Sequence, residues 1–188
     1  MMDYVTYYDN VLTPEMCNEI IAKFENNKSQ QETTFLQGHR HFTEINITKH
    51  HSDWSNIQNH ILDLMQYVLG KYMAQFKIDQ KSWPENVGYE QLRMKKYEPN
   101  GLDEFAFHVD VGNYASARRF LVYFFYLNDV EEGGHTAFQR NRNMEIEYKV
   151  QPKQGRLLMF PPLWTHPHIG MKPISGPKYI IGGYLHYV

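Results

Sequence analysis

The residues of this chain best placed to do chemistry are a histidine and an aspartate two positions apart, followed far downstream by two more histidines. His108 and Asp110 lie in a segment that predicts a β-strand, and because side chains alternate along a strand, both point to one face. Two ligands held in this way can bind one side of a metal ion. A distant histidine, His166 or His168, can complete the set once the fold brings it close.

Two histidines and one carboxylate on one face of a metal ion leave the opposite positions open, and this ligand set is typical of non-haem iron(II) oxygenases. A histidine close to an aspartate is by itself more often a surface pair or a satisfied hydrogen bond. Lys178, at the start of the last predicted strand, strengthens the hypothesis. If a 2-keto acid chelates the metal through one end, a lysine with a hydroxyl beside it can bind the carboxylate at the other end.

The elements that must position these residues are predicted strands in the C-terminal half. Apolar and aromatic side chains recur there over short segments, and turns rich in glycine and proline separate the segments. The predicted strands cover residues 89–97, 105–111, 119–127, 136–139, 144–150, 156–160 and 179–186. Short strands separated at this frequency indicate an antiparallel sandwich or a jelly roll.

The N-terminal part of the chain predicts two helices. Thr13 followed by Pro14 is typical of a helix start, because threonine caps the first turn and proline fits the first helical position. A second helix is expected to begin after Asp53, and its apolar residues keep a 3.6-residue spacing up to Phe76. The polar segment between the helices predicts one short strand over 42–47.

Length and composition indicate a single globular domain over residues 1–188, of which 42% are hydrophobic. We expect a mainly β fold of the α+β class, in which a helical support region (1–88) packs on one sheet of a jelly-roll core (89–188). The net charge of −2 gives no reason to expect nucleic acid or a membrane as a partner. A single cysteine, Cys17, and the lack of a signal-peptide pattern lead us to expect a cytoplasmic protein.

Four motifs in the predicted core make this interpretation more specific. They are Arg-Phe-Leu-Val-Tyr-Phe-Phe-Tyr-Leu-Asn-Asp at 119–129, Gly-Gly-His-Thr-Ala-Phe at 133–138, His-Ile-Gly at 168–170 and Gly-Pro-Lys at 176–178. In this order, after the His-x-Asp pair, they resemble the prolyl 4-hydroxylase-like family of Fe(II)- and 2-oxoglutarate-dependent dioxygenases. The resemblance covers the C-terminal half of the chain and implies a double-stranded β-helix, which is a variant of the jelly roll.

The resemblance also implies roles for the residues of the metal site. His108 and Asp110 match the first two iron ligands of the family. The family places the basic residue for its cosubstrate about ten positions after the last ligand, and Lys178 lies ten positions after His168 and twelve after His166. The resemblance therefore favours His168 as the third ligand and gives His166 a supporting place.

At the far end of the cosubstrate, the resemblance implies that Lys178 binds the distal carboxylate of 2-oxoglutarate. Thr136 and Tyr97 match positions that help to hold this carboxylate in members of the family. Fe(II) is then the metal and 2-oxoglutarate the cosubstrate, and ascorbate is a candidate accessory reductant.

The activity that the resemblance implies is hydroxylation of an aliphatic C–H bond, coupled to conversion of 2-oxoglutarate to succinate and carbon dioxide. The expected substrate is a prolyl residue in a peptide or protein. Two alternatives stay open at this point, namely an oxygenase acting on a small molecule such as a free amino acid, and a non-catalytic jelly-roll binding module. The loops expected to choose the substrate, 31–51 and 112–118, carry no readable code, and the sequence does not fix the oligomeric state.

Overall fold

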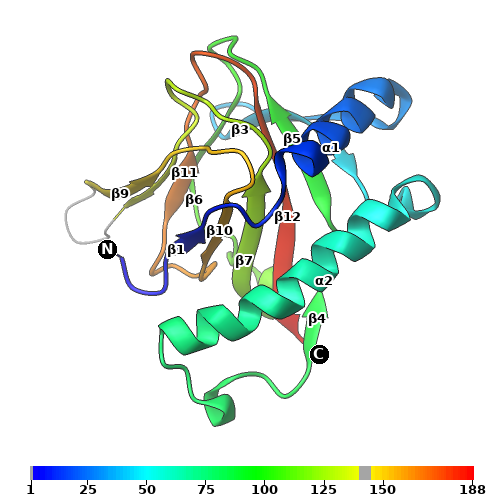
Figure 1. Cartoon of the computed structure of the whole chain (residues 1–188). Helices are drawn as coiled ribbons and strands as arrows, with labels where there is room; N and C mark the ends of the chain where they lie inside the picture. Colours follow the sequence, from blue (N-terminus) through cyan, green and yellow to red (C-terminus); the bar gives the residue numbers. More distant parts are fainter. Residues whose placement is uncertain (1, 140–144) are drawn as a thin grey trace.

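The computed structural model describes residues 2–139 and 145–188, and an antiparallel sheet that curls round on itself forms its centre (Figure 1). Within these residues the sheet has twelve strands. They are β1 (Thr6–Tyr8), β2 (Glu32–Leu36), β3 (Arg40–Asn46), β4 (Val87–Tyr89), β5 (Arg93–Tyr97), β6 (Glu104–His108), β7 (Arg119–Tyr126), β8 (Thr136–Gln139), β9 (Ile146–Val150), β10 (Leu157–Phe160), β11 (His168–Gly170) and β12 (Lys178–Tyr187). The described α-helices are α1 (Pro14–Asn26) and α2 (His51–Gln75).

The strand order shows how the sheet closes around an interior. Hydrogen-bonded neighbours follow the order β1-β10-β7-β12-β5-β3-β6-β11-β8-β9, while β2 pairs with β3 and β4 pairs with β12. Neighbours in the sheet are mostly distant in the chain, so the connections cross repeatedly between its two halves. Residues from β5, β6, β7, β8, β10, β11 and β12 line one common pocket inside the curl. The predicted mainly β fold of the jelly-roll type is confirmed.

Both helices pack on the outer face of the sheet, on the side of β5 and β12 (Figure 1). Thr13 caps α1 as predicted, because its hydroxyl accepts a hydrogen bond from the backbone N–H of Met16 at 3.3 Å. One core cluster joins the helices to strand residues such as Met94 and Ile181. Its helix members are Cys17, Ile20, Phe24, Trp54, Ile57, Ile61, Met65, Val68 and Tyr72. The predicted packing of the helices against one sheet is confirmed.

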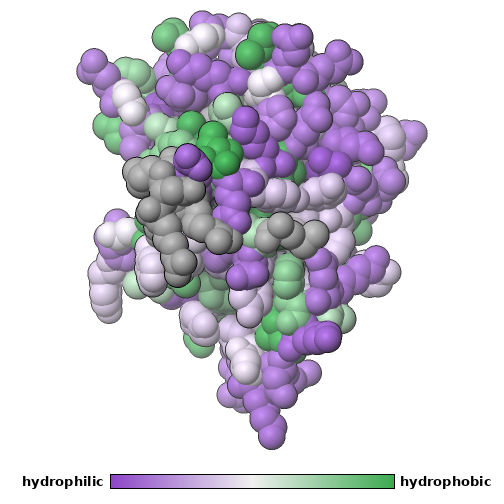
Figure 2. Space-filling view, turned by 90° about the vertical axis from the view of Figure 1, so that its left-hand side faces the viewer, coloured by the Kyte–Doolittle hydropathy of each residue, from purple (hydrophilic) through white to green (hydrophobic). Residues whose placement is uncertain are grey.

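One face of the molecule is mostly polar. Figure 2 shows the face that carries β9, where hydrophilic residues cover most of the surface and apolar residues lie in small separate groups. Scattered apolar side chains of this kind are normal on a globular protein. None of the helices in the described residues is long and apolar enough to cross a membrane.

The strand predicted over 105–111 is too long, and this changes how the metal site is built. β6 ends at His108, because the backbone N–H groups of Asp110 and Val111 both donate to the carbonyl of Pro162 at 3.1 Å rather than to a neighbouring strand. Asp110 therefore lies just beyond β6. The alternation of side chains along a strand does not by itself explain why Asp110 faces the same way as His108.

Three further differences concern strand boundaries. The strand predicted over 89–97 is divided into β4 and β5, because the backbone N–H of Leu92 donates to the hydroxyl of Thr48 instead of to a strand. The short strands β1, β2 and β11 were not predicted. The strand predicted over 144–150 begins on Met144, which lies outside the described residues, and β9 covers the part from Ile146.

Candidate active site

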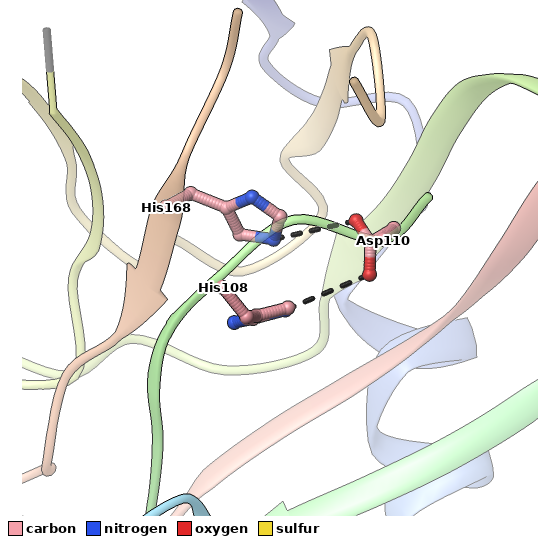
Figure 3. Close-up of side chains that lie close together, drawn as sticks. All are labelled: His108, Asp110 and His168. Carbon is pink, nitrogen blue, oxygen red and sulfur yellow. Dashed lines mark ion pairs between the residues drawn. The ribbon is translucent and has the colours of Figure 1, made fainter. Parts of the chain in front are cut away.

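Two neighbouring strands hold the two histidines of the predicted metal site. His108 is the last residue of β6 and His168 the first residue of β11, and the two lie opposite each other in this antiparallel pair. The carboxylate of Asp110 faces both imidazoles (Figure 3). His108 Nε2 lies 3.5 Å from Asp110 Oδ1, and His168 Nε2 lies 3.4 Å from Asp110 Oδ2. The candidate ligand atoms all lie within 4.8 Å of one another.

The backbone orients both imidazoles for metal binding. Nδ1 of His108 lies 2.7 Å from the carbonyl oxygen of Ala106, and Nδ1 of His168 lies 3.2 Å from the carbonyl oxygen of His166. Because a carbonyl oxygen can only accept, each Nδ1 carries the proton and each Nε2 keeps its lone pair toward Asp110. Metal-binding histidines are usually held in this way by their second nitrogen.

Asp110 offers one oxygen that no protein group satisfies. The hydroxyl of Tyr184 donates to Asp110 Oδ1 at 2.7 Å, whereas Oδ2 is buried and has no hydrogen-bond partner among the described residues. A buried carboxylate oxygen without a donor is costly unless a cation binds it. This unpartnered oxygen, together with two imidazole lone pairs, fits a divalent metal ion that binds nitrogen and oxygen ligands.

The electrostatics of these residues suit a cation. Burial lowers the pKa of His168 to about 4, so this imidazole is neutral at neutral pH. Burial alone would raise the pKa of Asp110, but the adjacent His168 and His108 and the hydroxyl of Tyr184 outweigh it and hold that pKa below its usual range. A charged carboxylate beside a neutral imidazole is the state in which such ligands bind a metal.

His166 is turned away from this cluster. Its Nε2 lies 2.8 Å from the carbonyl oxygen of Asp3, and its Nδ1 lies 2.8 Å from the hydroxyl of Thr165. Both ring nitrogens therefore have partners in the N-terminal segment and the adjoining loop. The backbone carbonyl of His166 holds His168, so the contribution of His166 to the cluster comes from its main chain.

Lys178 begins β12 and points into the interior of the curled sheet. Its Nζ is buried, donates to the carbonyl of Gly134 at 3.0 Å and lies 4.4 Å from the centre of the Tyr97 ring. Tyr97 is also its direct partner across the pair of β5 and β12. Burial lowers the pKa of Lys178 to about 7, and nearby Lys95 acts in the same direction. An ammonium group has three protons to donate, so Lys178 retains capacity for an anionic ligand.

A buried hydroxyl pair lies on the wall formed by β7 and β8. The hydroxyl of Tyr126 lies 2.7 Å from Oγ1 of Thr136 and donates to it. Thr136 is thereby left with its own proton to donate to an acceptor in the pocket. Tyr126 was not singled out from the sequence as a functional residue, because its position in an aromatic run is explained equally well by core packing.

All six residues predicted from the sequence line a single pocket, which we call the inner pocket. They are His108, Asp110, His168, Lys178, Thr136 and Tyr97. Its cavity volume is about 60 Å³, and the pocket is partly open to solvent. The remaining lining residues are Lys95, Phe105, Val122, Phe124, Phe160, Gly170, Ile180 and Tyr184. The pocket thus combines a polar cluster and a buried cation with walls that are largely apolar.

A larger depression, which we call the outer groove, adjoins the inner pocket. The two share Lys95, Val122, Phe124, Ile180 and Tyr184, and the outer groove continues over residues of β4, β5, β7 and β12 and over Ala115 and Arg118. Part of the segment 112–118 therefore borders the outer groove. A bound molecule could reach from this groove toward the metal cluster.

Arg119 links the outer groove to the metal cluster. Its guanidinium forms two hydrogen bonds with the carboxylate of Glu90 at 2.9 and 2.8 Å. It also donates to the backbone carbonyl of Asp110 at 3.0 Å and lies 3.9 Å from the centre of the Tyr184 ring. Arg119 therefore fixes the main chain of Asp110, and Tyr184 fixes one of its carboxylate oxygens.

Comparison with known proteins identifies the family to which this chain belongs. The family model of the 2OG-Fe(II) oxygenase superfamily matches residues 92–186, which is half of the chain. The matched segment contains the three candidate metal ligands and the three residues predicted to hold the cosubstrate. No curated protein sequence matches the chain.

Solved structures with the same fold include enzymes of different activity. A viral collagen prolyl hydroxylase from Paramecium Bursaria Chlorella virus-1 in complex with 2OG has a TM-score of 0.65 at 19% identity, and the match covers 99% of this chain and 97% of that chain. A prolyl hydroxylase from Trichoplax adhaerens, in complex with a hypoxia inducible factor peptide fragment, has a TM-score of 0.73 at 17% identity. The match covers 98% of this chain and 84% of that chain. SnoN, a non-heme alpha ketoglutarate dependent epimerase from nogalamycin biosynthesis, has a TM-score of 0.67 at 15% identity. The match covers 98% of this chain and 79% of that chain. At these identities the likeness shows the fold and confirms the predicted double-stranded β-helix.

Proposed function

We propose that His108, Asp110 and His168 hold the iron of this protein. The chain belongs to the 2OG-Fe(II) oxygenase superfamily and is therefore an Fe(II)- and 2-oxoglutarate-dependent dioxygenase. The observation that carries this assignment is the buried, unpartnered Oδ2 of Asp110 beside two imidazole nitrogens whose protons are held on the far side of each ring. Two nitrogen ligands and one carboxylate on one side leave positions free for a chelating cosubstrate and dioxygen.

The cosubstrate is proposed to lie along the inner pocket, from the metal cluster to Lys178. Lys178 would bind the distal carboxylate through charge and hydrogen bonds, Thr136 would donate its remaining proton, and Tyr97 would border the same carboxylate. When bound, iron and 2-oxoglutarate would supply the chemistry by which one oxygen atom of dioxygen is inserted into a C–H bond, while the other oxygen atom is incorporated into succinate as 2-oxoglutarate loses carbon dioxide. The apolar walls, among them Phe105 and Phe160, limit access of water to this reaction.

The proposed substrate is a prolyl residue in an extended peptide that lies in the outer groove. Two observations support a peptide. The outer groove is the larger of the two depressions and opens into the inner pocket, and the fold is shared with prolyl hydroxylases, one of them bound to a peptide fragment. Remote contacts along a peptide can orient the reacting carbon, which is why free proline should react less well than a proline-containing peptide.

An anaerobic titration tests the iron and cosubstrate sites directly. Adding Fe(II) and then 2-oxoglutarate to the protein should produce a visible metal-to-ligand charge-transfer band that saturates at one equivalent of each. Addition of oxygen should then release succinate. The same titration with the Asp110→Ala variant is the control and should give no band. A wild-type protein that gives neither band nor succinate would leave the binding-module alternative as the better explanation.

The substrate class is tested by mass spectrometry of peptides and free amino acids incubated with the complete enzyme. A proline-containing peptide should gain about 16 Da, the mass of one oxygen atom inserted into a C–H bond. The small-molecule alternative has one observation in its favour, since the fold is shared with an enzyme of nogalamycin biosynthesis. If free amino acids are oxidised while a broad peptide library is not, that alternative is correct. A cytoplasmic location stays a prediction.

A further inference from the structure

A second lysine enters the interior of the sheet at the junction of the inner pocket and the outer groove. Lys95 lies two residues before Tyr97 on β5, so both side chains point to the same face. It lines both depressions, together with Ile180, its direct partner on β12. Lys178 is the partner of Tyr97, so the two lysines enter the interior about 7 Å apart along the strands.

The ammonium group of Lys95 has aromatic neighbours but no anionic partner. Its Nζ lies 4.7 Å from the ring centre of Phe42 and 5.5 Å from that of Phe105, which stacks on His108. Within the described residues, Nζ of Lys95 takes part in no hydrogen bond and no ion pair. The residue is partly exposed, as a pocket-lining residue is, and its ammonium lies deep in the fold.

The carboxylates nearest in the sheet are already engaged by other residues. Glu44 is the partner of Lys95 across β3 and β5, yet its Oε1 accepts from Thr34 at 2.9 Å and from Arg93 at 3.3 Å. Glu90, at the other side of the outer groove, is held by Arg119 as described above. The wall that the inner pocket and the outer groove share therefore contains one charged residue, Lys95. Within the described residues, no anion forms an ion pair with its ammonium group.

An unmatched ammonium in this place needs a physical reason. A buried charge is unfavourable unless it is paired, and an aliphatic side chain such as that of Ile180 would fill the wall without this cost. A lysine that only covers apolar surface with its stem would extend its charge to bulk water. The ammonium of Lys95 instead lies over two aromatic rings beside the metal cluster. Burial lowers its pKa, and the carboxylates of Glu44 and Asp110 act in the opposite direction.

We propose that Lys95 binds a carboxylate of the substrate and holds it at the entrance to the inner pocket, close to the carbon that is oxidised. This inference rests on the proposed function and names the chemistry of its substrate, which is an acidic molecule. The distal carboxylate of 2-oxoglutarate has its own cation in Lys178, with Thr136 beside it, so the two lysines serve different anions. The carboxylate could belong to an acidic residue near a target residue in a peptide, or to a free amino acid.

Binding calorimetry under anaerobic conditions, with Fe(II) and 2-oxoglutarate already bound, tests the proposal without turnover. The probes are short N-acetylated peptide amides that contain one proline. A single glutamate occupies, in turn, each of the three positions before and the three positions after the proline. Each of these peptides is compared with a peptide that has glutamine at the same position. Free L-proline and L-prolinamide form a second pair. At least one acidic probe should bind ten times more tightly than its neutral twin. The peptide pairs and the proline pair distinguish the two sources of the carboxylate.

Variants assign this preference to Lys95. Lys95→Met keeps an unbranched apolar stem over the aromatic rings and should abolish the difference between acidic and neutral probes, whereas Lys95→Arg should retain it. Lys96→Met is the matched control, because Lys96 lies on the other face of β5 and pairs with Glu25 and Glu98. It should bind every probe as the wild type does. Thermal melting shows whether each variant is folded.

Two results would overturn the proposal. The first is a wild-type protein that binds no acidic probe more tightly than its neutral twin, a result that needs no variant. The second is a Lys95→Met variant that keeps the preference or loses 2-oxoglutarate affinity instead, which would place Lys95 with the cosubstrate. A normal charge-transfer band alongside either result would leave the proposed dioxygenase function standing, whereas loss of the band in the wild type would remove that function itself.

Discussion

The inner pocket and the outer groove differ in how their charged groups are matched. In the inner pocket Asp110 Oδ2 has no hydrogen-bond partner among the described residues, and Lys178 uses one acceptor for three protons. In the outer groove Arg119 pairs with Glu90, and the groove-lining Arg93 pairs with Glu44. An unmatched buried charge is costly, so it marks a place where a charged ligand is expected.

This difference separates residues that do chemistry from residues that hold the fold. The inner pocket retains unused donor and acceptor capacity beside its apolar walls, which suits a metal and a charged cosubstrate. In the outer groove, Glu90 and Glu44 neutralise the guanidinium groups of Arg119 and Arg93, and these ion pairs stabilise the ends of strands. Lys95 lies in the wall that the two regions share, and its unmatched charge resembles the inner pocket more than the groove.

Removal of a proposed metal ligand should have the largest effect. His108→Ala, Asp110→Ala and His168→Ala should each abolish tight Fe(II) binding and succinate formation, because two ligands hold the ion too weakly. His166→Ala is the matched control two residues from His168, since its imidazole bonds to Asp3 and Thr165 instead. It should keep Fe(II) affinity while losing about 1–3 kcal/mol of unfolding free energy, because two hydrogen bonds of the imidazole are lost. The measurements are Fe(II) titration and thermal melting.

The opposite pattern would show that the distal ligand has been assigned wrongly. An active His168→Ala protein and an inactive, folded His166→Ala protein would make His166 the third ligand. Such a result would also break the comparison above, since the unmatched oxygen of Asp110 would then have no cation to bind.

Removal of the inner cation should have the next largest effect. Lys178→Met should raise the concentration of 2-oxoglutarate needed for half saturation at least tenfold, because an unpaired buried carboxylate costs about 2–5 kcal/mol. Fe(II) affinity without the cosubstrate should stay unchanged, since Lys178 contacts Gly134 and Tyr97 and none of the ligands. The charge-transfer titration measures both quantities. Unaltered 2-oxoglutarate affinity would remove Lys178 from the cosubstrate site.

The sequence predicts the inner pocket better than the outer groove for a physical reason. His108, Asp110 and Lys178 lie at the ends of strands with strong aromatic and turn patterns, so their approximate positions follow from the order of those strands. The path of the chain at Asp110 could not be predicted, because it depends on the carbonyl of Pro162 more than fifty residues away. β11 has only three residues, which is too short for any periodicity to show.

Long-range partners could not be derived from the sequence either. Tyr184 and Asp110 are separated by 74 positions, and only the pairing of strands brings them together. Lys95 and Lys96 are adjacent and chemically identical, yet one faces the pocket and the other pairs with Glu25 and Glu98 outside it. Strand register separates these two lysines, and residue type does not. Selectivity for substrate is therefore less visible in the sequence than the metal chemistry is.

A smaller effect is expected when the support of a ligand is removed and the ligand is kept. Tyr184→Phe deletes the hydroxyl that donates to Asp110 Oδ1, which should weaken Fe(II) binding about 10- to 100-fold, as is usual for partners of metal ligands. Tyr123→Phe is the matched control, because the buried Tyr123 hydroxyl has no hydrogen-bond partner among the described residues. Its removal should leave Fe(II) affinity unchanged. Equal affinities in both variants would mean that Asp110 needs no help from Tyr184.

The smallest expected effect concerns pH. Burial lowers the pKa of Lys178 to about 7 before the cosubstrate binds, so the lysine is charged below this pH and mostly neutral above it. Binding of the distal carboxylate favours the charged form, so each binding event above pH 7 must also take up a proton. Affinity for 2-oxoglutarate should therefore be constant below about pH 7 and fall about tenfold for each unit above it, as linkage requires.

Lys178→Arg separates this cause from others, because a guanidinium stays charged over the whole range and should give a flat profile. His168 does not contribute to the slope, since its pKa of about 4 lies well below the range tested. The profile is measured by titrating the charge-transfer band from pH 6 to about 8.5, with Fe(II) affinity followed separately. A slope that persists in Lys178→Arg would assign the titrating group elsewhere and would leave Lys178 charged in the empty pocket.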